Sequence, residues 1–203
     1  MTSTLSTAAA GFATGLSLIV AIGAQNALVL RQGVRRDAVL PVVAICALSD
    51  AVLIALGVAG VGAVVVAWPS ALTVVALLGG VFLICYGVLA ARRALRPSAL
   101  LAGDAPNGTR RGPVLACLAM TWLNPHVYLD TVFLLGSVAA DRGSGRWVFG
   151  LGAVLASLCW FAALGFGARL LSGVLARPSS WRVLDGLVAA MMIGLGAKLM
   201  LGA

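Results

Sequence analysis

Glutamate is absent from this chain of 203 residues, and only 10% of the residues are charged. A soluble domain carries about 25% charged residues, because its surface must face water. This chain is instead 62% hydrophobic, and its apolar residues form long runs. The shortage of charge excludes a soluble enzyme and indicates a membrane protein whose outer surface faces lipid.

Histidine and cysteine are also scarce. The chain has one histidine, His126, and four cysteines without a Cys-x-x-Cys pair. A metal site needs several such ligands close together, so we expect no metal, no cofactor and no catalytic residues. The cysteines lie far apart inside apolar runs, which favours small buried core residues over a disulfide framework or a thiol relay. They are Cys46, Cys85, Cys117 and Cys159.

The remaining charges are mostly positive. Fourteen Lys and Arg residues stand against six Asp residues, giving a net charge of +8. The basic residues occupy short loops between apolar runs. This placement suits anionic lipid headgroups and a topology signal, and it argues against a nucleic-acid partner.

Six apolar stretches reach the length of about 20 residues that a membrane-spanning helix needs. The sequence therefore predicts an all-α integral membrane protein in which residues 1–203 form a single transmembrane domain. The six predicted spans are 8–30, 38–66, 70–91, 114–140, 147–170 and 183–202.

The basic residues also predict the orientation, because cytoplasmic loops carry an excess of Lys and Arg. The first, third and fifth loops together carry eleven basic residues, whereas the opposite side carries only Arg142, Arg146 and Lys198. We therefore expect the odd loops to be cytoplasmic and both termini to lie outside.

The stretch 92–113 contains Arg, Pro, Gly and Asp residues, and it predicts a cytoplasmic linker between two halves, 1–91 and 114–203. Each half has three predicted spans, so homologous halves would insert with opposite orientations, as in the inverted repeats of many transporters. Polar residues interrupt the first span of each half, at Gln25-Asn26 and at Asn124. We therefore expect a 3+3 inverted repeat with interrupted helices in spans one and four.

Two aspartates lie inside predicted spans, Asp50 in span two and Asp130 in span four. An Asp at the centre of a spanning helix costs about 2.5–3.5 kcal/mol on insertion scales. An ion or substrate site would explain this cost, and pairing with Arg31 or Arg169 is the alternative. Asp185 differs, because it follows Arg182 by three residues at a span start and is expected to form an interfacial pair or a helix-start charge.

Asn124 and Pro125 predict a helix start within span four. Asn is a preferred N-cap, and Pro suits the first helical position because its missing N–H is not needed there. Such a helix end carries partial positive charge and can bind a carboxylate; a simple proline kink is the alternative. His126 and Asp130 are one turn apart and share a face, and Tyr128 stands four residues after Asn124.

At these residues the sequence resembles the lysine/arginine exporter family (LysE type). The resemblance rests on Gly23 to Gly33, on Ser49-Asp50 and on Thr121 to Thr131, and it covers nearly the whole chain. Where the family has Gly-Pro-Gln-Asn in span one, this chain has Ala24 in place of the proline.

The resemblance implies a secondary active exporter of L-lysine or L-arginine in the bacterial inner membrane. Exchange with protons would make export of a cation electroneutral. A membrane thiol relay that carries electrons, or a metal-ion exporter of similar six-span fold, is the alternative. The residues expected to bind substrate are Gln25, Asn26, Asp50, Asn124, Pro125, His126, Tyr128 and Asp130.

Overall fold

The computed structural model describes residues 2–20, 23–60, 69–95, 111–171, 173 and 177–202. These residues form helices and turns, and no strand occurs among them. Helices suit a bilayer because each one pairs its backbone N–H and C=O groups within the same segment. The prediction of an all-α fold is confirmed.

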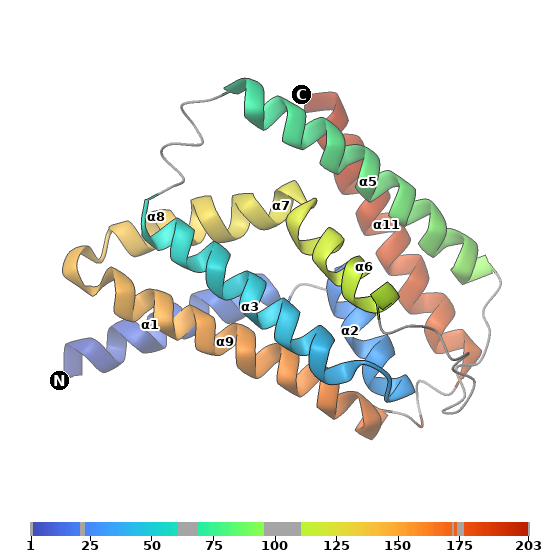
Figure 1. Cartoon of the computed structure of the whole chain (residues 1–203), viewed down its shortest axis with the longest axis horizontal. Coiled ribbons are helices and arrows are strands. Elements are labelled where there is room, and N and C mark those ends of the chain that lie inside the picture. Colours follow the sequence, from blue (N-terminus) through green and yellow to red (C-terminus); the bar gives the residue numbers. More distant parts are fainter. Residues whose placement is uncertain are drawn as a thin grey trace.

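Figure 1 shows the helices in their order along the chain. The segment η1 is a π-helix, and η2 and η3 are 3₁₀-helices. The elements are α1 (Thr2–Ile19), α2 (Ala24–Arg35), α3 (Val39–Val58), α5 (Pro69–Leu95), α6 (Arg111–Trp122), α7 (Pro125–Val127), η1 (Tyr128–Leu134), α8 (Leu135–Ala140), η2 (Gly143–Gly145), α9 (Arg146–Gly167), η3 (Ala168–Leu171) and α11 (Pro178–Gly202).

Four described helical segments are long and apolar enough to cross a membrane, and the bent pair α1–α2 makes a possible fifth. The predicted span 114–140 is instead divided among α6, α7, η1 and α8, of which the apolar pieces Gly112–Trp122 and Tyr128–Ala140 are shorter. The chain is therefore a helical membrane protein with four to five candidate spans, and the count of six stays a prediction. The four are Val39–Val58, Leu77–Leu95, Gly143–Leu170 and Pro178–Leu201.

The helices reach into both ends of the predicted linker, 92–113. The helix α5 continues to Leu95, and α6 begins at Arg111. The middle of the linker, residues 96–110, lies outside the described residues, as do residues 61–68 at the end of the predicted second span.

Helices break at both places where the sequence predicts an interruption. The axes of α1 and α2 meet at 87°, between Ile19 and Ala24. In the second half, α6 ends at Trp122 and α7 begins at Pro125. The helix start that Asn124-Pro125 predicts is confirmed.

Packing divides the helices into two groups (Figure 1). The helix α9 lies along α1 and α3, and α3 also packs against α6, η1 and α8. The helices α5 and α11 pack along each other and touch the first group at α7 and α2. The pair α5–α11 therefore lies to one side of the bundle.

Small residues allow these helices to approach closely, as is common where lipid provides no hydrophobic drive for helix association. A Cβ atom at Gly136 of α8 would lie 2.7 Å from the carbonyl oxygen of Gly57 on α3. Glycines take the same role where α1 meets α9 and where α5 meets α11. They are Gly11, Gly15 and Gly152 at the first contact, and Gly80, Gly87 and Gly196 at the second.

We predict that Gly136→Ala destabilises the protein, because the added methyl group would meet the Gly57 backbone. Overpacking of this kind costs about 1–3 kcal/mol. Gly194→Ala on α11 is the matched control, since nothing lies within 4 Å of a Cβ there. The melting temperature of the purified protein in detergent should fall for Gly136→Ala and hold or rise for the control. Equal melting temperatures for both variants would contradict the close contact.

Candidate functional site

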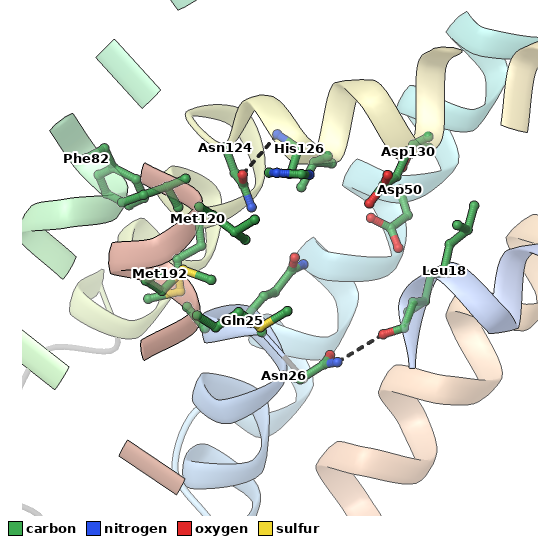
Figure 2. A pocket seen from close by; sticks show the side chains of 18 of the residues that line it. Leu18, Gln25, Asn26, Asp50, Phe82, Met120, Asn124, His126, Asp130 and Met192 are labelled. Carbon is green, nitrogen blue, oxygen red and sulfur yellow. Dashed lines mark hydrogen bonds between the residues drawn. The ribbon is translucent and has the colours of Figure 1, made fainter. Parts of the chain in front are cut away.

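The two helix breaks border one cavity. Its volume is about 240 Å³, which is below the usual range of about 300–1,000 Å³ for drug-sized ligands and suits a molecule the size of an amino acid. Figure 2 shows Asp50 and Asp130 at one end of the cavity and Phe82 and Met192 at the other. Its polar lining consists of Gln25, Asn26, Asp50, Asn124, His126, Asp130 and Thr131.

The cavity is acidic. Asp50 and Asp130 line it, and none of the described residues that line it is Arg or Lys. The apolar residues of the wall include Phe82 of α5, Met120 of α6 and Met192 of α11. The site thus combines two carboxyl groups with an apolar wall.

Asn124 caps the second half-helix of the broken segment. Its side-chain oxygen accepts a hydrogen bond from the backbone N–H of His126 at 3.1 Å, and its carbonyl oxygen accepts one from the N–H of Val127 at 3.1 Å. An N-cap side chain of this kind pairs one of the orphan N–H groups at a helix start. The cap holds Asn124 and His126 at the cavity wall (Figure 2).

At each break, a side chain also donates a hydrogen bond to a backbone carbonyl group in the last turn before the break. The hydroxyl of Tyr128 donates to the carbonyl oxygen of Trp122 at 2.8 Å. In the first half, the side-chain amide of Asn26 donates to the carbonyl oxygen of Ile19 at 3.0 Å. In each half, therefore, a side chain beyond the break pairs with the last turn before it.

Asp50 is buried on α3 and accepts a hydrogen bond of 2.7 Å from the hydroxyl of Ser157 on α9. The alternative partners expected for it are engaged elsewhere. Arg31 pairs with Asp185, and Arg169 donates to the carbonyl oxygen of Phe166. Within the described part of the chain, Asp50 and Asp130 belong to no ion pair.

Asp130 lies on the π-helix η1 and is partly exposed. A π-helical turn is rare and often marks a functional site. The predicted neighbour one turn earlier, His126, lines the same cavity. Asp130 therefore meets Asp50 at the cavity from a different helix (Figure 2).

Gln25 and Asn26 start the half-helix α2 at the cavity. Asn26 is held from two sides, because its side-chain oxygen also accepts a hydrogen bond of 3.3 Å from the indole of Trp160. The side-chain nitrogen of Gln25 is buried and has no hydrogen-bond partner among the described residues. A buried donor is costly to leave unpaired, and the Gln25 side chain interacts with the neighbouring Cys46 thiol.

The structure brings together six of the eight predicted site residues. Tyr128 lies outside the cavity lining and pairs with the backbone instead, and the side chain of Pro125 is outside what the structure describes. Sequence reasoning missed Ser157 and Trp160, which hold Asp50 and Asn26. A buried Ser in an apolar span was the available signal for Ser157, but its partner lies 107 positions away.

The cysteines differ from the prediction. Cys46 and Cys117 are buried as expected, but their sulfur atoms lie 2.9 Å apart, so two thiols distant in sequence become neighbours. Cys85 and Cys159 are exposed on the outer surface of the helices, so the prediction of buried core residues is wrong for these two. The described residues contain no group of three or more His, Cys, Asp or Glu side chains that could hold a metal ion.

Asp185 also differs from the prediction. It is buried, and it pairs with Arg31 of α2 at 2.7 Å and with Arg93 of α5 at 3.4 Å. Arg182, its expected partner, is exposed one turn earlier. Asp185 therefore joins three helices rather than making a local pair on α11.

The comparisons with known proteins agree with one another and match the chain to transport proteins. The profile of a family described as LysE type translocator matches residues 16–203. The chain is 52% identical over 180 residues to a Mycobacterium tuberculosis protein named as a candidate amino-acid transporter, covering 88% of this chain and 89% of the relative. No solved structure matches the chain.

Two further relatives carry more specific names. The chain is 41% identical over 227 residues to the lysine exporter LysE of Corynebacterium diphtheriae, covering 97% of this chain and 100% of the relative. It is 41% identical over 191 residues to the arginine exporter ArgO of Serratia proteamaculans, covering 93% of both chains.

We predict that Asn124→Ala destabilises the protein by about 1 kcal/mol, because the N–H of His126 loses its cap. Asn124→Asp keeps a capping oxygen and should recover most of that loss. The melting temperature in detergent measures both variants. An Asn124→Ala protein as stable as the parent would contradict the capping role.

Proposed function

Because this chain belongs to the family of LysE-type translocators, we propose that it exports the basic amino acids L-arginine and L-lysine. The observation that carries the proposal is the cavity itself, whose described lining holds two carboxyl groups and no Arg or Lys side chain. Buried charges in proteins are normally paired. A substrate that brings its own positive charge supplies the missing partner.

The two carboxyl groups match the charge of the substrate. Arginine and lysine each carry two positive groups, one at the α-carbon and one at the end of the side chain. We propose that Asp50 and Asp130, which share one end of the cavity (Figure 2), together bind one of these groups, with Ser157 holding the Asp50 carboxyl group in place. The apolar wall formed by Phe82, Met120 and Met192 then contacts the aliphatic stem.

The substrate carboxylate needs hydrogen-bond donors. The side-chain nitrogen of Gln25, a residue of the cavity lining, is a buried donor. The start of the half-helix at Pro125 adds partial positive charge nearby, through the aligned peptide dipoles. We assign the carboxylate to this part of the cavity, between the two helix breaks. Asn26, His126 and Tyr128 shape the site, since each is tied to one of the breaks.

Export of a cation works against an inside-negative potential, which costs about 2.3 kcal/mol per charge for each 100 mV. Exchange for one proton makes the cycle electroneutral, so that the pH gradient drives it. An aspartate that holds either a cation or a proton provides that exchange. We therefore propose that Asp50 or Asp130 carries the proton on the return step.

The arrangement of helices supports a 3+3 inverted repeat. The broken pair α1–α2 with α3 and α5 corresponds in order to the broken segment α6–α8 with α9 and α11. Corresponding contacts occur in both halves, since α1 and α2 pack on α9 while α6 and α8 pack on α3. In such transporters the substrate binds at broken helices between the halves. We propose an inner-membrane location with the basic loops cytoplasmic.

We predict that Asp50→Asn and Asp130→Asn each lower exchange of labelled arginine or lysine in proteoliposomes about a hundredfold or more. Removing one partner of a buried ion pair costs about 3–5 kcal/mol, which sets this scale. Asp141→Asn, at an exposed position after α8, is the matched control and should exchange normally. Normal counterflow by both cavity variants, in folded protein, would refute the proposed site.

A variant without cysteine separates this proposal from a thiol relay. We predict that replacing all four cysteines by Ala leaves counterflow within a few-fold of the parent rate. The thiol pair Cys46 and Cys117 contacts the apolar core and does not line the cavity. An electron relay would lose all activity, so abolished function in a folded variant would favour the relay. Melting temperature reports folding in the same samples.

A further inference from the structure

A cluster of charged and aromatic side chains joins α2 to the pair α5–α11. One terminal nitrogen of Arg31 donates to both oxygens of Asp185, at 2.7 and 2.8 Å, and the Nε of Arg93 lies 3.4 Å from Oδ1. The guanidinium of Arg31 also lies 4.8 Å from the ring centre of Trp181, and that of Arg93 lies 5.2 Å from the ring centre of Tyr86. None of these residues lines the cavity.

The cluster lies at one end of the bundle. Arg31 is near the end of α2, Arg93 is near the end of α5, and Asp185 is in the first part of α11. Figure 1 shows these helix ends gathered on the same side of the molecule, where α6 also begins. The first, third and fifth loops connect these helix ends along the chain.

The same three helices form a wall of the cavity. Gln25 of α2, Leu83 of α5 and Met192 of α11 line it. Each lies six to ten residues from the cluster residue on its own helix, which is roughly 9–15 Å at 1.5 Å per residue. An apolar layer that includes Ala27, Ala90 and Val188 fills the space between them. A substrate that leaves or enters at this end must separate α2 from α5–α11 and break the cluster.

The partners of Arg31 form a site for a guanidinium group. These partners are the buried carboxylate of Asp185, which Arg93 also contacts, and the face of the Trp181 indole ring. A free arginine side chain, or the ammonium of lysine, needs the same partners. The protein therefore occupies with its own arginine a site that a cationic amino acid would also fit.

We propose that Arg31, Arg93 and Asp185 form a gate at this end of the cavity, and that Asp185 is a second, transient binding site for the cationic group of the substrate. This inference rests on the proposed function for the identity of the ligand. When the substrate cation replaces Arg31 on Asp185, the freed Arg31 binds the substrate carboxylate. The ion pair between Arg31 and Asp185 is thereby replaced by two similar pairs, one between the substrate cation and Asp185 and one between Arg31 and the substrate carboxylate. The gate therefore opens without leaving a buried charge unpaired.

The test measures access to the cavity and does not depend on transport. In a variant without native cysteine, Leu195→Cys places a thiol in the cavity lining of α11. A membrane-impermeant methanethiosulfonate is applied to membrane vesicles from the side of the first, third and fifth loops. We expect slow labelling in this background and about tenfold faster labelling when Asp185→Asn is added, a change of about 1.4 kcal/mol. Saturating arginine should speed labelling only when Asp185 is present.

Two further variants keep the test specific. Exchanging the charges, with Arg31→Asp and Asp185→Arg together, should restore slow labelling, whereas Arg182→Gln at an exposed position on α11 should change nothing. Equal labelling rates with and without Asp185, or no rescue by the exchanged pair, would overturn the gate. Counterflow of arginine and lysine is measured in the cysteine-free variant before Leu195→Cys is added. Its absence there would overturn the proposed function and with it the ligand assigned here, whereas normal counterflow with unaltered access would overturn the gate alone.

Discussion

The hydrocarbon core of a bilayer contains no water to bind backbone groups, and every interruption of a helix there must be repaired by the protein. Two breaks border the cavity of this chain. At the second one Asn124 binds the N–H of His126 and Tyr128 binds the carbonyl of Trp122. At the first one Asn26 binds the carbonyl of Ile19. These bonds make it possible to place a polar cavity between apolar helices.

The charges follow from the same constraint. A carboxylate inside a membrane protein needs a partner, and the protein handles Asp50, Asp130 and Asp185 in two ways. Asp185 is fully paired with Arg31 and Arg93 at the end of the bundle. Asp50 and Asp130 face the cavity with no ion pair in the described structure. The first arrangement holds helices together, and the second leaves charge available for a ligand.

Close helix packing gives these side chains their positions. Glycine contacts hold α3 against α8 and α5 against α11, so that Asp50 and Asp130 reach the cavity from neighbouring helices. The pair α5–α11 touches the rest of the bundle through few elements and carries the Asp185 cluster. A pair attached in this way is suited to move as a unit. Motion of one packed unit against another is the usual basis of alternating access.

The sequence by itself determined the features that depend on near neighbours in the chain. Apolar runs predicted the helices, Asn124-Pro125 predicted a helix start, and polar residues inside the spans identified six side chains of the cavity. Only the tertiary structure decided the contacts between distant segments, such as Asp185 with Arg31, 154 positions apart, and Cys46 with Cys117, 71 positions apart. The physical reason is that lipid and protein core are both apolar, so hydrophobic pattern does not tell which face of a helix meets another helix. That choice depends on how small and polar side chains fit together once the helices pack.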